Sequence, residues 1–283
     1  LTIVADDFGF TSPGDETDNL AAVRIDTVPA AGTLWLDAND NGTLDGGEEV
    51  SASQVVSLAD LNADRLRFSP AANENGTGYA SFTFSVQDDG AGGAFDDTPN
   101  TLTIDVTAVN NPPTVSWDRD NSDGGADDGS FATSFTEGDG PVTIADSDAD
   151  VVDADDAAMT SLTLTAGGIQ DGASEVFTLG GEAFSQDSDK NATVTVGGTT
   201  FDIAYTVADG QFAISNNGGG DMPVADINTL LQGITYANGS ANPTDGNRTL
   251  SVLTNDGETD SNTAVATITV NAINDAPAAV NDS

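Results

Sequence analysis

The stretch DANDNGTLDGGE, residues 37–48, has the residue types and the spacing of a loop that binds a divalent cation. Asp37 stands at the first position of the pattern D-x-[DN]-x-[DN]-G-x5-E, Gly42 at the sharp turn, and Glu48 at the last position, where a carboxylate binds through both oxygens. Oxygen ligands at alternate positions of a tight coil suit calcium, which accepts about six to eight of them. The predicted ligands are Asp37, Asn39, Asn41, Thr43 through its carbonyl, Asp45 and Glu48.

This loop is expected at the tip of a β-hairpin, because the apolar run TLWL precedes it and the strand-like SASQVVSL follows it. Only Asp37, Asp45 and Glu48 among the ligand side chains carry charge, so we expect a Kd of roughly 0.1 to 1 mM, as in extracellular modules. The alternative is a solvated acidic turn without an ion. The sequence favours calcium, because the loop matches the pattern at every specified position.

Composition restricts the chemistry of the chain to hard oxygen ligands. The 283 residues include 47 Asp and Glu against 6 Lys and Arg, a formal net charge of -41. This charge repels nucleic acid and anionic membranes, and it opposes compaction unless salt or bound cations screen it. The absence of Cys and His excludes disulfides, thiolate or imidazole zinc sites, and catalytic groups that need either residue. Several calcium ions are therefore the expected cofactors.

Short alternating runs of Val, Ile, Thr and Phe predict an all-β protein. Only residues 57–66 and 224–234 have helix-like spacing, and each is expected to form one short helix. The sequence has no apolar run long enough to span a bilayer and no N-terminal signal pattern, so we expect a segment of a longer protein. The predicted strands lie within residues 80–86, 100–109, 191–207, 248–254 and 263–273.

The chain contains one unit used twice. LADLNADRL aligns with VADINTLLQ, SFTFSVQDDG with TLSVLTNDG, and TLTIDVTAVNNPPTV with VATITVNAINDAPAAV. The alignment places Leu1 opposite Val142, and the second copy has a lead-in, residues 113–141, without a counterpart in the first, so we expect the first unit to be truncated at its start. Asn and Pro predict stiff linkers at VNNPP and INDAP. The predicted domains are 1–110, 111–275 and the start of a following unit at 276–283.

These features resemble the bacterial cadherin-like repeats of giant RTX-type and biofilm adhesins. The resemblance rests on the alternating strands, the DDG or NDG before the last strand and the Asn/Pro linkers, and it covers nearly the whole chain. It implies tandem immunoglobulin-like β-sandwiches, exported by type I secretion to the surface of a Gram-negative bacterium, with calcium at or near the junctions. The sequence departs from the pattern at Asn111, where such repeats often have Asp.

Two further acidic regions are candidate calcium sites. Asp118, Asp120 and Ser122 stand at alternate positions, as in the first half of the loop at 37–48, but no Glu follows at the last position. A solvated acidic loop is the alternative. The third region gathers carboxylates that would repel one another in a poorly solvated pocket, namely Glu137, Asp146, Asp148, Asp150, Asp153, Asp155 and Asp156. The resemblance implies junction ligands at Glu137, Asp153, Asp155, Asp89, Asn110, Asp256 and Asp275.

The sequence favours a calcium-rigidified structural segment of a secreted adhesin, a monomer whose partners are the neighbouring repeats of its parent chain. The alternative is a calcium-dependent module that binds a glycan or another surface, with Trp35 or Trp117 as a stacking platform; both Trp residues stand in strand-like positions that favour core packing. A glycosidase needs an acid in an apolar pocket, whereas these acids lie on polar loops, so we predict no enzymatic activity. Neither nucleic acid nor membrane insertion is expected.

Overall fold

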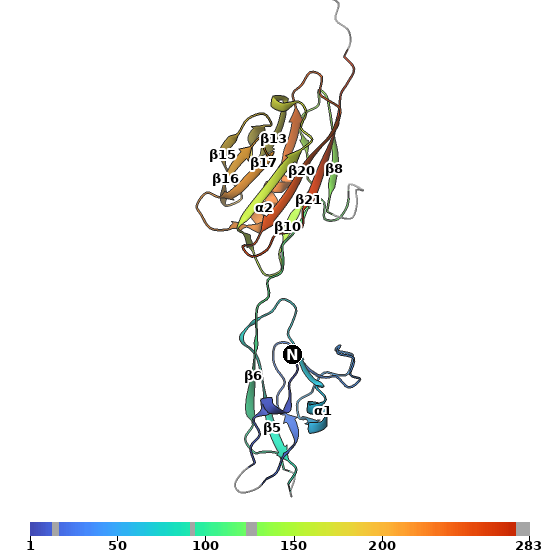
Figure 1. The fold of residues 1–283 in the computed structure, drawn as a ribbon, viewed down its shortest axis with the longest axis vertical. Helices are drawn as coiled ribbons and strands as arrows, with labels where there is room; N and C mark the ends of the chain where they lie inside the picture. Colours follow the sequence, from blue (N-terminus) through green and yellow to red (C-terminus); the bar gives the residue numbers. More distant parts are fainter. Residues whose placement is uncertain (13–16, 91–93, 123–128, 276–283) are drawn as a thin grey trace, which may run out of the picture. The chain divides into compact units, whose positions relative to one another are not determined.

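The computed structural model describes residues 1–12, 17–90, 94–122 and 129–275. The chain divides into two compact units, unit 1 from Leu1 to Val109 and unit 2 from Asn110 to Ser283. In each unit the regular secondary structure is mostly β-strand (Figure 1). The predicted all-β class is therefore confirmed, while the predicted start of a following unit at 276–283 lies outside the described residues.

Unit 1 is a sandwich of two small sheets around one core. The larger sheet is antiparallel in the order β3-β1-β5-β6, and the smaller sheet pairs β2 with β4. Buried side chains from both sheets, among them Val23, Phe68 and Phe82, form one hydrophobic cluster. The elements are η1 (Ala5–Phe8), β1 (Leu20–Ile25), β2 (Thr33–Leu36), β3 (Gln54–Ser57), α1 (Leu58–Asn62), β4 (Leu66–Ser69), β5 (Gly76–Asp88) and β6 (Asn100–Val106).

Unit 2 is a larger sandwich of the same kind. One sheet has the order β15-β16-β17-β12-β20-β21-β8 and the other β14-β13-β19-β9, with one core between them. Every pairing in the two sheets is antiparallel except that of β21 with β8, which is parallel. The strands of the first sheet are β8 (Phe131–Thr136), β12 (Ser161–Gly167), β15 (Lys190–Val196), β16 (Thr199–Thr206), β17 (Gln211–Asn216), β20 (Gly246–Asn255) and β21 (Ala264–Asn271). Those of the second are β9 (Val142–Thr143), β13 (Glu175–Leu179), β14 (Glu182–Ser185) and β19 (Thr235–Asn238).

The remaining elements of unit 2 flank the sandwich. Two short strand pairs, β7 with β10 and β11 with β18, lie outside the main sheets. Among the described residues, no helix has the length and apolar character that crossing a membrane requires. The elements are β7 (Thr114–Ser116), β10 (Asp150–Val152), β11 (Ala158–Met159), η2 (Gly172–Ser174), β18 (Met222–Pro223) and α2 (Val224–Gln232).

Both predicted helices are confirmed, since α1 and α2 lie within residues 57–66 and 224–234. Helix α1 begins after Ser57, whose hydroxyl accepts a hydrogen bond from the N–H of Asp60 at 3.1 Å and so satisfies one free donor of the first turn. In α2 the apolar residues Ile227, Leu230 and Leu231 are buried. The spacing of three and four residues thus places one face of this helix on the core.

The predicted register of the repeat is visible in the backbone. In unit 1 the N–H of Ile3 donates to the carbonyl of Leu66 at 2.8 Å, and in unit 2 the N–H of Ile144 donates to the carbonyl of Ile234 at 3.3 Å. These are the same bonds at equivalent places, because β4 and β19 follow α1 and α2. The predicted alignment is displaced by two residues here, since it places Leu66 opposite Gln232 rather than Ile234, and α2 is the longer helix. Leu1 therefore occupies the position of Val142, as the alignment predicts.

Both tryptophans belong to the hydrophobic interior. Trp35 is 4% exposed and its Nε1–H donates to the hydroxyl of Ser69 at 3.0 Å. Trp117 is fully buried and its Nε1–H donates to the carbonyl of Ala264 at 3.2 Å. Core packing is confirmed for both residues, so neither ring presents a face on which a sugar could stack.

Candidate calcium sites

The loop of residues 37–48 is the tip of a hairpin, as predicted, but its returning segment differs from the predicted one. An antiparallel bridge joins Trp35 to Glu49, and the N–H of Leu36 donates to the carbonyl of Glu48 at 2.8 Å. The strand predicted to return, β3, instead pairs with β1 in the other sheet. The loop is therefore closed directly at its base by residues 48–50.

The first and last positions of the loop hold its backbone from inside. Asp37 is fully buried, and its carboxylate accepts hydrogen bonds from the N–H groups of Asn41 at 3.1 Å and Gly42 at 2.9 Å. Glu48 is 9% exposed, and its carboxylate accepts hydrogen bonds from the N–H groups of Ala38 at 3.0 Å and Asp45 at 2.9 Å. Both carboxylates thus point into the coil.

The remaining predicted ligands also face one another. The side-chain amides of Asn39 and Asn41 donate to Asp45 Oδ2 at 3.0 and 2.7 Å, and these two bonds lower the pKa of Asp45. The N–H and the hydroxyl of Thr43 both donate to Asn41 Oδ1, at 2.8 and 2.7 Å. A cation at the centre would be bound by oxygens that now accept hydrogen bonds from within the loop.

Arg67 is a residue of this site that the sequence pattern does not reveal. Its guanidinium Nη2 lies 3.2 Å from Asp37 Oδ2, and the group stacks over the ring of Trp35. A positive charge beside the first ligand partly neutralises that carboxylate and weakens the attraction of a divalent cation. Side chains alternate along β4, so Arg67 points away from the face that carries the buried Leu66 and Phe68. Only the folded chain brings Arg67 next to Asp37.

Changing Asp37 to Asn and Glu48 to Gln together is expected to remove one calcium ion from the bound total, because both carboxylate clasps of the loop lose their charge. Isothermal titration calorimetry measures the stoichiometry. The matched control changes Asp64 to Asn and Glu49 to Gln, two exposed acids outside the predicted ligand set. An unchanged stoichiometry in the first variant, with its circular dichroism intact, would contradict the assignment.

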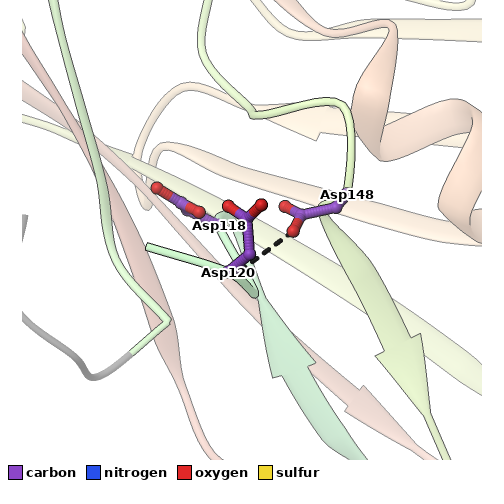
Figure 2. A group of neighbouring side chains, drawn as sticks. All are labelled: Asp118, Asp120 and Asp148. Atoms are coloured by element: carbon purple, nitrogen blue, oxygen red, sulfur yellow. Dashed lines mark hydrogen bonds between the residues drawn. The ribbon is translucent and has the colours of Figure 1, made fainter. Parts of the chain in front are cut away.

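The second site gains a carboxylate from a distant segment. Figure 2 shows Asp148 beside Asp118 and Asp120. One carboxylate oxygen from each of the three lies within 4.8 Å of the others, and Asp118 is 3% exposed. Asp148 accepts hydrogen bonds from the N–H groups of Arg119 at 3.0 Å and Asp120 at 2.9 Å. Three carboxylates therefore converge here, whereas the sequence predicted two carboxylates with Ser122 and assigned Asp148 to the third acidic region.

The hydrogen bonds of this second site reproduce those of the first loop. The N–H of Ser122 donates to Asp118 Oδ1 at 3.2 Å and Asp120 Oδ1 at 3.1 Å. In the loop at 37–48, the N–H of Asn41 donates in the same way to Asp37 Oδ1 at 3.1 Å and to Asn39 Oδ1 at 3.0 Å. Glu48 accepts a hydrogen bond from the N–H of Ala38, the residue after Asp37, and Asp148 accepts one from the N–H of Arg119, the residue after Asp118. Asp148 thus takes the place of the missing last-position Glu.

Other predicted ligands gather where the chain enters unit 2. We call residues 110–111, 153–156 and 256–259 the linker end. The backbone N–H of Asn111 donates to both oxygens of Asp155, at 3.3 and 3.2 Å. The side-chain amide of Asn110 donates to Asp256 Oδ2 at 2.9 Å. The carboxylates of Asp153, Asp155 and Asp156 have oxygens within 4.8 Å of one another.

The electrostatics of the linker end differ from one carboxylate to the next. Burial raises the pKa of Asp156, and the neighbouring charges of Asp153 and Asp155 raise it further. Burial also acts to raise the pKa of Asp256, but hydrogen bonds from the backbone of Thr259 and the amide of Asn110 outweigh it and lower the pKa to about 2. Asp256 is thus held ionised, whereas the charges of its neighbours Asp153 and Asp155 oppose ionisation of Asp156.

The structure does not bring all of the predicted junction residues together. Glu137 follows β8, and its carboxylate accepts a hydrogen bond from the N–H of Ile273 at 2.8 Å. Ile273 and Asp275 follow the last residue of β21, whereas Asp256 precedes its first residue. These residues therefore flank opposite ends of this strand. Asp89 belongs to unit 1, where its carboxylate accepts from the backbone N–H of Asn19 at 2.7 Å. A calcium role for these residues stays a prediction.

The chain is similar to solved structures, but no protein-family model or curated protein matches it. A crystal structure of human CDH23 EC21-23 is 14% identical with a TM-score of 0.32, covering 90% of this chain and 62% of that chain. Mouse Cadherin-23 EC22-24 is 13% identical with a TM-score of 0.29, covering 86% and 53%. This chain therefore spans less than two thirds of either cadherin chain.

A third solved structure is the C-terminal domain of the Streptococcus pyogenes antigen I/II-family protein AspA. It is 11% identical with a TM-score of 0.19, covering 88% of this chain and 84% of that chain. The class to which this protein belongs is defined by its own fold, a tandem of two-sheet β-sandwich modules with acidic loops.

Proposed function

We propose that the chain is a calcium-binding structural segment of a large secreted adhesin of the RTX type, on the surface of a Gram-negative bacterium. Calcium would stiffen the modules and their linker for adhesion or biofilm formation. The observation that carries this proposal is the convergence of Asp118, Asp120 and Asp148 on a backbone frame that matches the loop at 37–48. One continuous loop and one loop completed by a distant Asp thus have the same pattern of backbone hydrogen bonds to their carboxylates.

The charge of the chain supplies the physical reason. A formal net charge of -41 opposes compaction, and carboxylates gathered within a few ångströms repel one another most strongly where water is scarce. A divalent cation bound among them removes this repulsion and links the segments that supply the ligands. Each site whose free ion is at about tenfold excess over its Kd adds roughly 1.4 kcal/mol to the free energy of unfolding.

The linker end gives calcium a way to act on the chain between the modules. Asn110 and Asn111 are bound directly by Asp256 and Asp155, and two prolines follow them. Proline restricts its own backbone and that of the residue before it. A cation bound by the 153–156 carboxylates would thus fix the first residues of the linker to the body of unit 2. The burial of both tryptophans removes the aromatic platform of the glycan-binding alternative.

Small-angle scattering tests this function. In chelator, the intact chain is expected to show a broader distribution of interatomic distances than in several millimolar calcium, with each module unchanged in size. The reason is that, without a cation, repulsion among the carboxylates of residues 153–156 would loosen the segment to which Asn111 is bonded. Adding calcium back should restore the narrow distribution.

Magnesium at equal concentration is the control, and it should substitute poorly because it requires compact octahedral sites and gives up its water reluctantly. Identical scattering profiles in chelator and in calcium would mean that protein contacts alone set the range of motion, and the proposed stiffening role would be abandoned.

A further inference from the structure

Two basic residues lie beside the loop at 37–48. The chain has only six Lys and Arg residues, and two of them, Arg65 and Arg67, stand at or next to the start of β4. In the pairing of β2 with β4, Arg67 lies opposite Trp35, and the N–H of Asp37 donates to the carbonyl of Arg65 at 2.9 Å. The register of these two strands therefore places both cations near the residue at which the loop begins.

The two arginines contact different carboxylates of the loop. Arg65 donates to both oxygens of Asp40, at 3.0 Å from Nε and 2.9 Å from Nη2. Asp40 is the fourth residue of the loop, and the calcium pattern takes no ligand from this position. Arg67 Nη2 instead lies 3.2 Å from Oδ2 of Asp37, the first predicted ligand. One arginine is thus paired with a predicted ligand and the other with a carboxylate outside the ligand set.

Charge and stacking hold the guanidinium of Arg67 in place. Its Cζ lies 5.6 Å from the centroid of the Trp35 ring. A Cβ added to Gly42 would lie 3.7 Å from Arg67 Nη1, so the group also lies against the turn of the loop. Its Nε is buried and has no hydrogen-bond partner among the described residues. Few directed bonds would therefore have to break if another cation replaced Arg67 at Asp37.

Asp37 is a carboxylate that needs a positive partner. It is fully buried, and a buried charge is costly unless it is paired and hydrogen-bonded. The backbone N–H groups of Asn41 and Gly42 donate to it, and among the described residues Arg67 is its ion-pair partner. A calcium ion bound by the same carboxylate would supply two positive charges, which the charge of Arg67 repels. Arg67 therefore compensates Asp37 without calcium and opposes the binding of calcium.

We propose that Arg67 is the resident counter-ion of the loop at 37–48, which keeps Asp37 in place without calcium and sets the calcium affinity of the loop. The inference rests on the proposed function, because it requires this loop to bind calcium. Arg67 does not itself bind the ion; it acts through the first ligand. It follows that the loop is folded both with and without the ion, and that its Kd lies above the value that its oxygens alone would give.

Changing Arg67 to Met is expected to destabilise unit 1 without calcium and to tighten its calcium binding. Without calcium, the unfolding temperature of unit 1 should fall, because Asp37 stays buried without a cation. The Kd of the loop should fall by roughly fivefold to tenfold, because the ion no longer meets a positive charge beside its first ligand. Isothermal titration calorimetry measures the Kd, and Trp35 fluorescence in a Trp117→Phe background reports the unfolding of unit 1. Loss of packing alone would lower the unfolding temperature and leave the Kd unchanged.

Two variants serve as matched controls. Arg65→Met removes the same charge from the same loop, and it should change the Kd by less than about twofold, because Arg65 is paired with the exposed Asp40 outside the ligand set. Arg67→Lys keeps the positive charge and should keep the Kd within about twofold of that of the natural chain.

The double variant Asp37→Asn with Glu48→Gln identifies the binding that belongs to this loop, as the ion that it no longer binds. If that variant still binds every ion, the loop is not a calcium site, and the proposed function fails at this loop together with the role of Arg67. If it loses one ion while Arg67→Met leaves the Kd of the loop unchanged, or while Arg65→Met tightens binding as much as Arg67→Met, only the role of Arg67 is overturned.

Discussion

Replacing Glu175 with Leu is expected to lower the free energy of unfolding of unit 2 by about 3–5 kcal/mol, because it leaves Arg248 as a buried charge with too little compensation. Both side chains are fully buried, and Arg248 Nε lies 2.5 Å from Glu175 Oε1. Arg248 also contacts Asp171, with 3.2 Å between Nη2 and Oδ2. The hydroxyl of Tyr236 donates to Glu175 Oε1 at 3.1 Å, and burial raises the pKa of this tyrosine.

Replacing Arg248 with Met is expected to cost a similar amount, since Glu175 then becomes the uncompensated charge. The double variant, Arg248→Met with Glu175→Leu, should lose much less than the sum of the two, because neither fully buried charge is left without its partner. Asp171 loses its contact with Arg248 but still accepts hydrogen bonds from Asn238 and Thr244. This non-additivity distinguishes an ion pair from two independent packing contributions.

The exposed pair of Lys190 and Glu182, 3.0 Å apart, is the matched control, and its removal should cost less than about 1 kcal/mol. Each unit has a single Trp, so a Trp35→Phe background reports the unfolding of unit 2 alone through Trp117. Single variants at the buried pair that cost no more than the control would contradict the expectation.

The strand pattern and the repeat were predictable because they depend on local periodicity. Alternation of apolar and polar residues identified β5, β6, β20 and β21, and helical spacing identified α1 and α2. The loop at 37–48 was recognisable because all of its ligands lie within one continuous motif. These features need no knowledge of which segments meet in the folded chain.

The features that the sequence did not reveal depend on strand pairing. Arg67 reaches Asp37 because β4 pairs with β2. Asp148 binds the backbone of Arg119 and Asp120, which precede it by 29 and 28 positions in the sequence. Strand β3 was wrongly predicted to close the hairpin around the loop at 37–48. It pairs with β1 instead, and no pattern within β3 indicates which strand it will pair with. The resemblance placed Glu137 and Asp153 at one junction, yet Glu137 follows β8 and its carboxylate contacts Ile273.

The contact of Asp148 with Asp118 and Asp120 makes a prediction whose sign depends on calcium. Each oxygen of Asp148 accepts one backbone hydrogen bond from residues 119–120, so Asp148→Asn keeps one of these two bonds, and it removes one of three crowded charges. In chelator the variant should be at least as stable as the natural chain, because the repulsion among these carboxylates falls. In calcium it should be less stable, because the site has lost a charged ligand.

Urea unfolding followed at Trp117 measures both comparisons. At a calcium concentration about tenfold above the Kd, the natural chain gains roughly 1.4 kcal/mol from this site, and Asp148→Asn should lose most of that gain. Asp209→Asn, which removes the same charge from an exposed turn, corrects for the general effect of net charge and should leave the calcium response unchanged. If Asp148→Asn and Asp209→Asn respond equally to calcium, the three carboxylates are a solvated acidic loop and the second site has to be withdrawn.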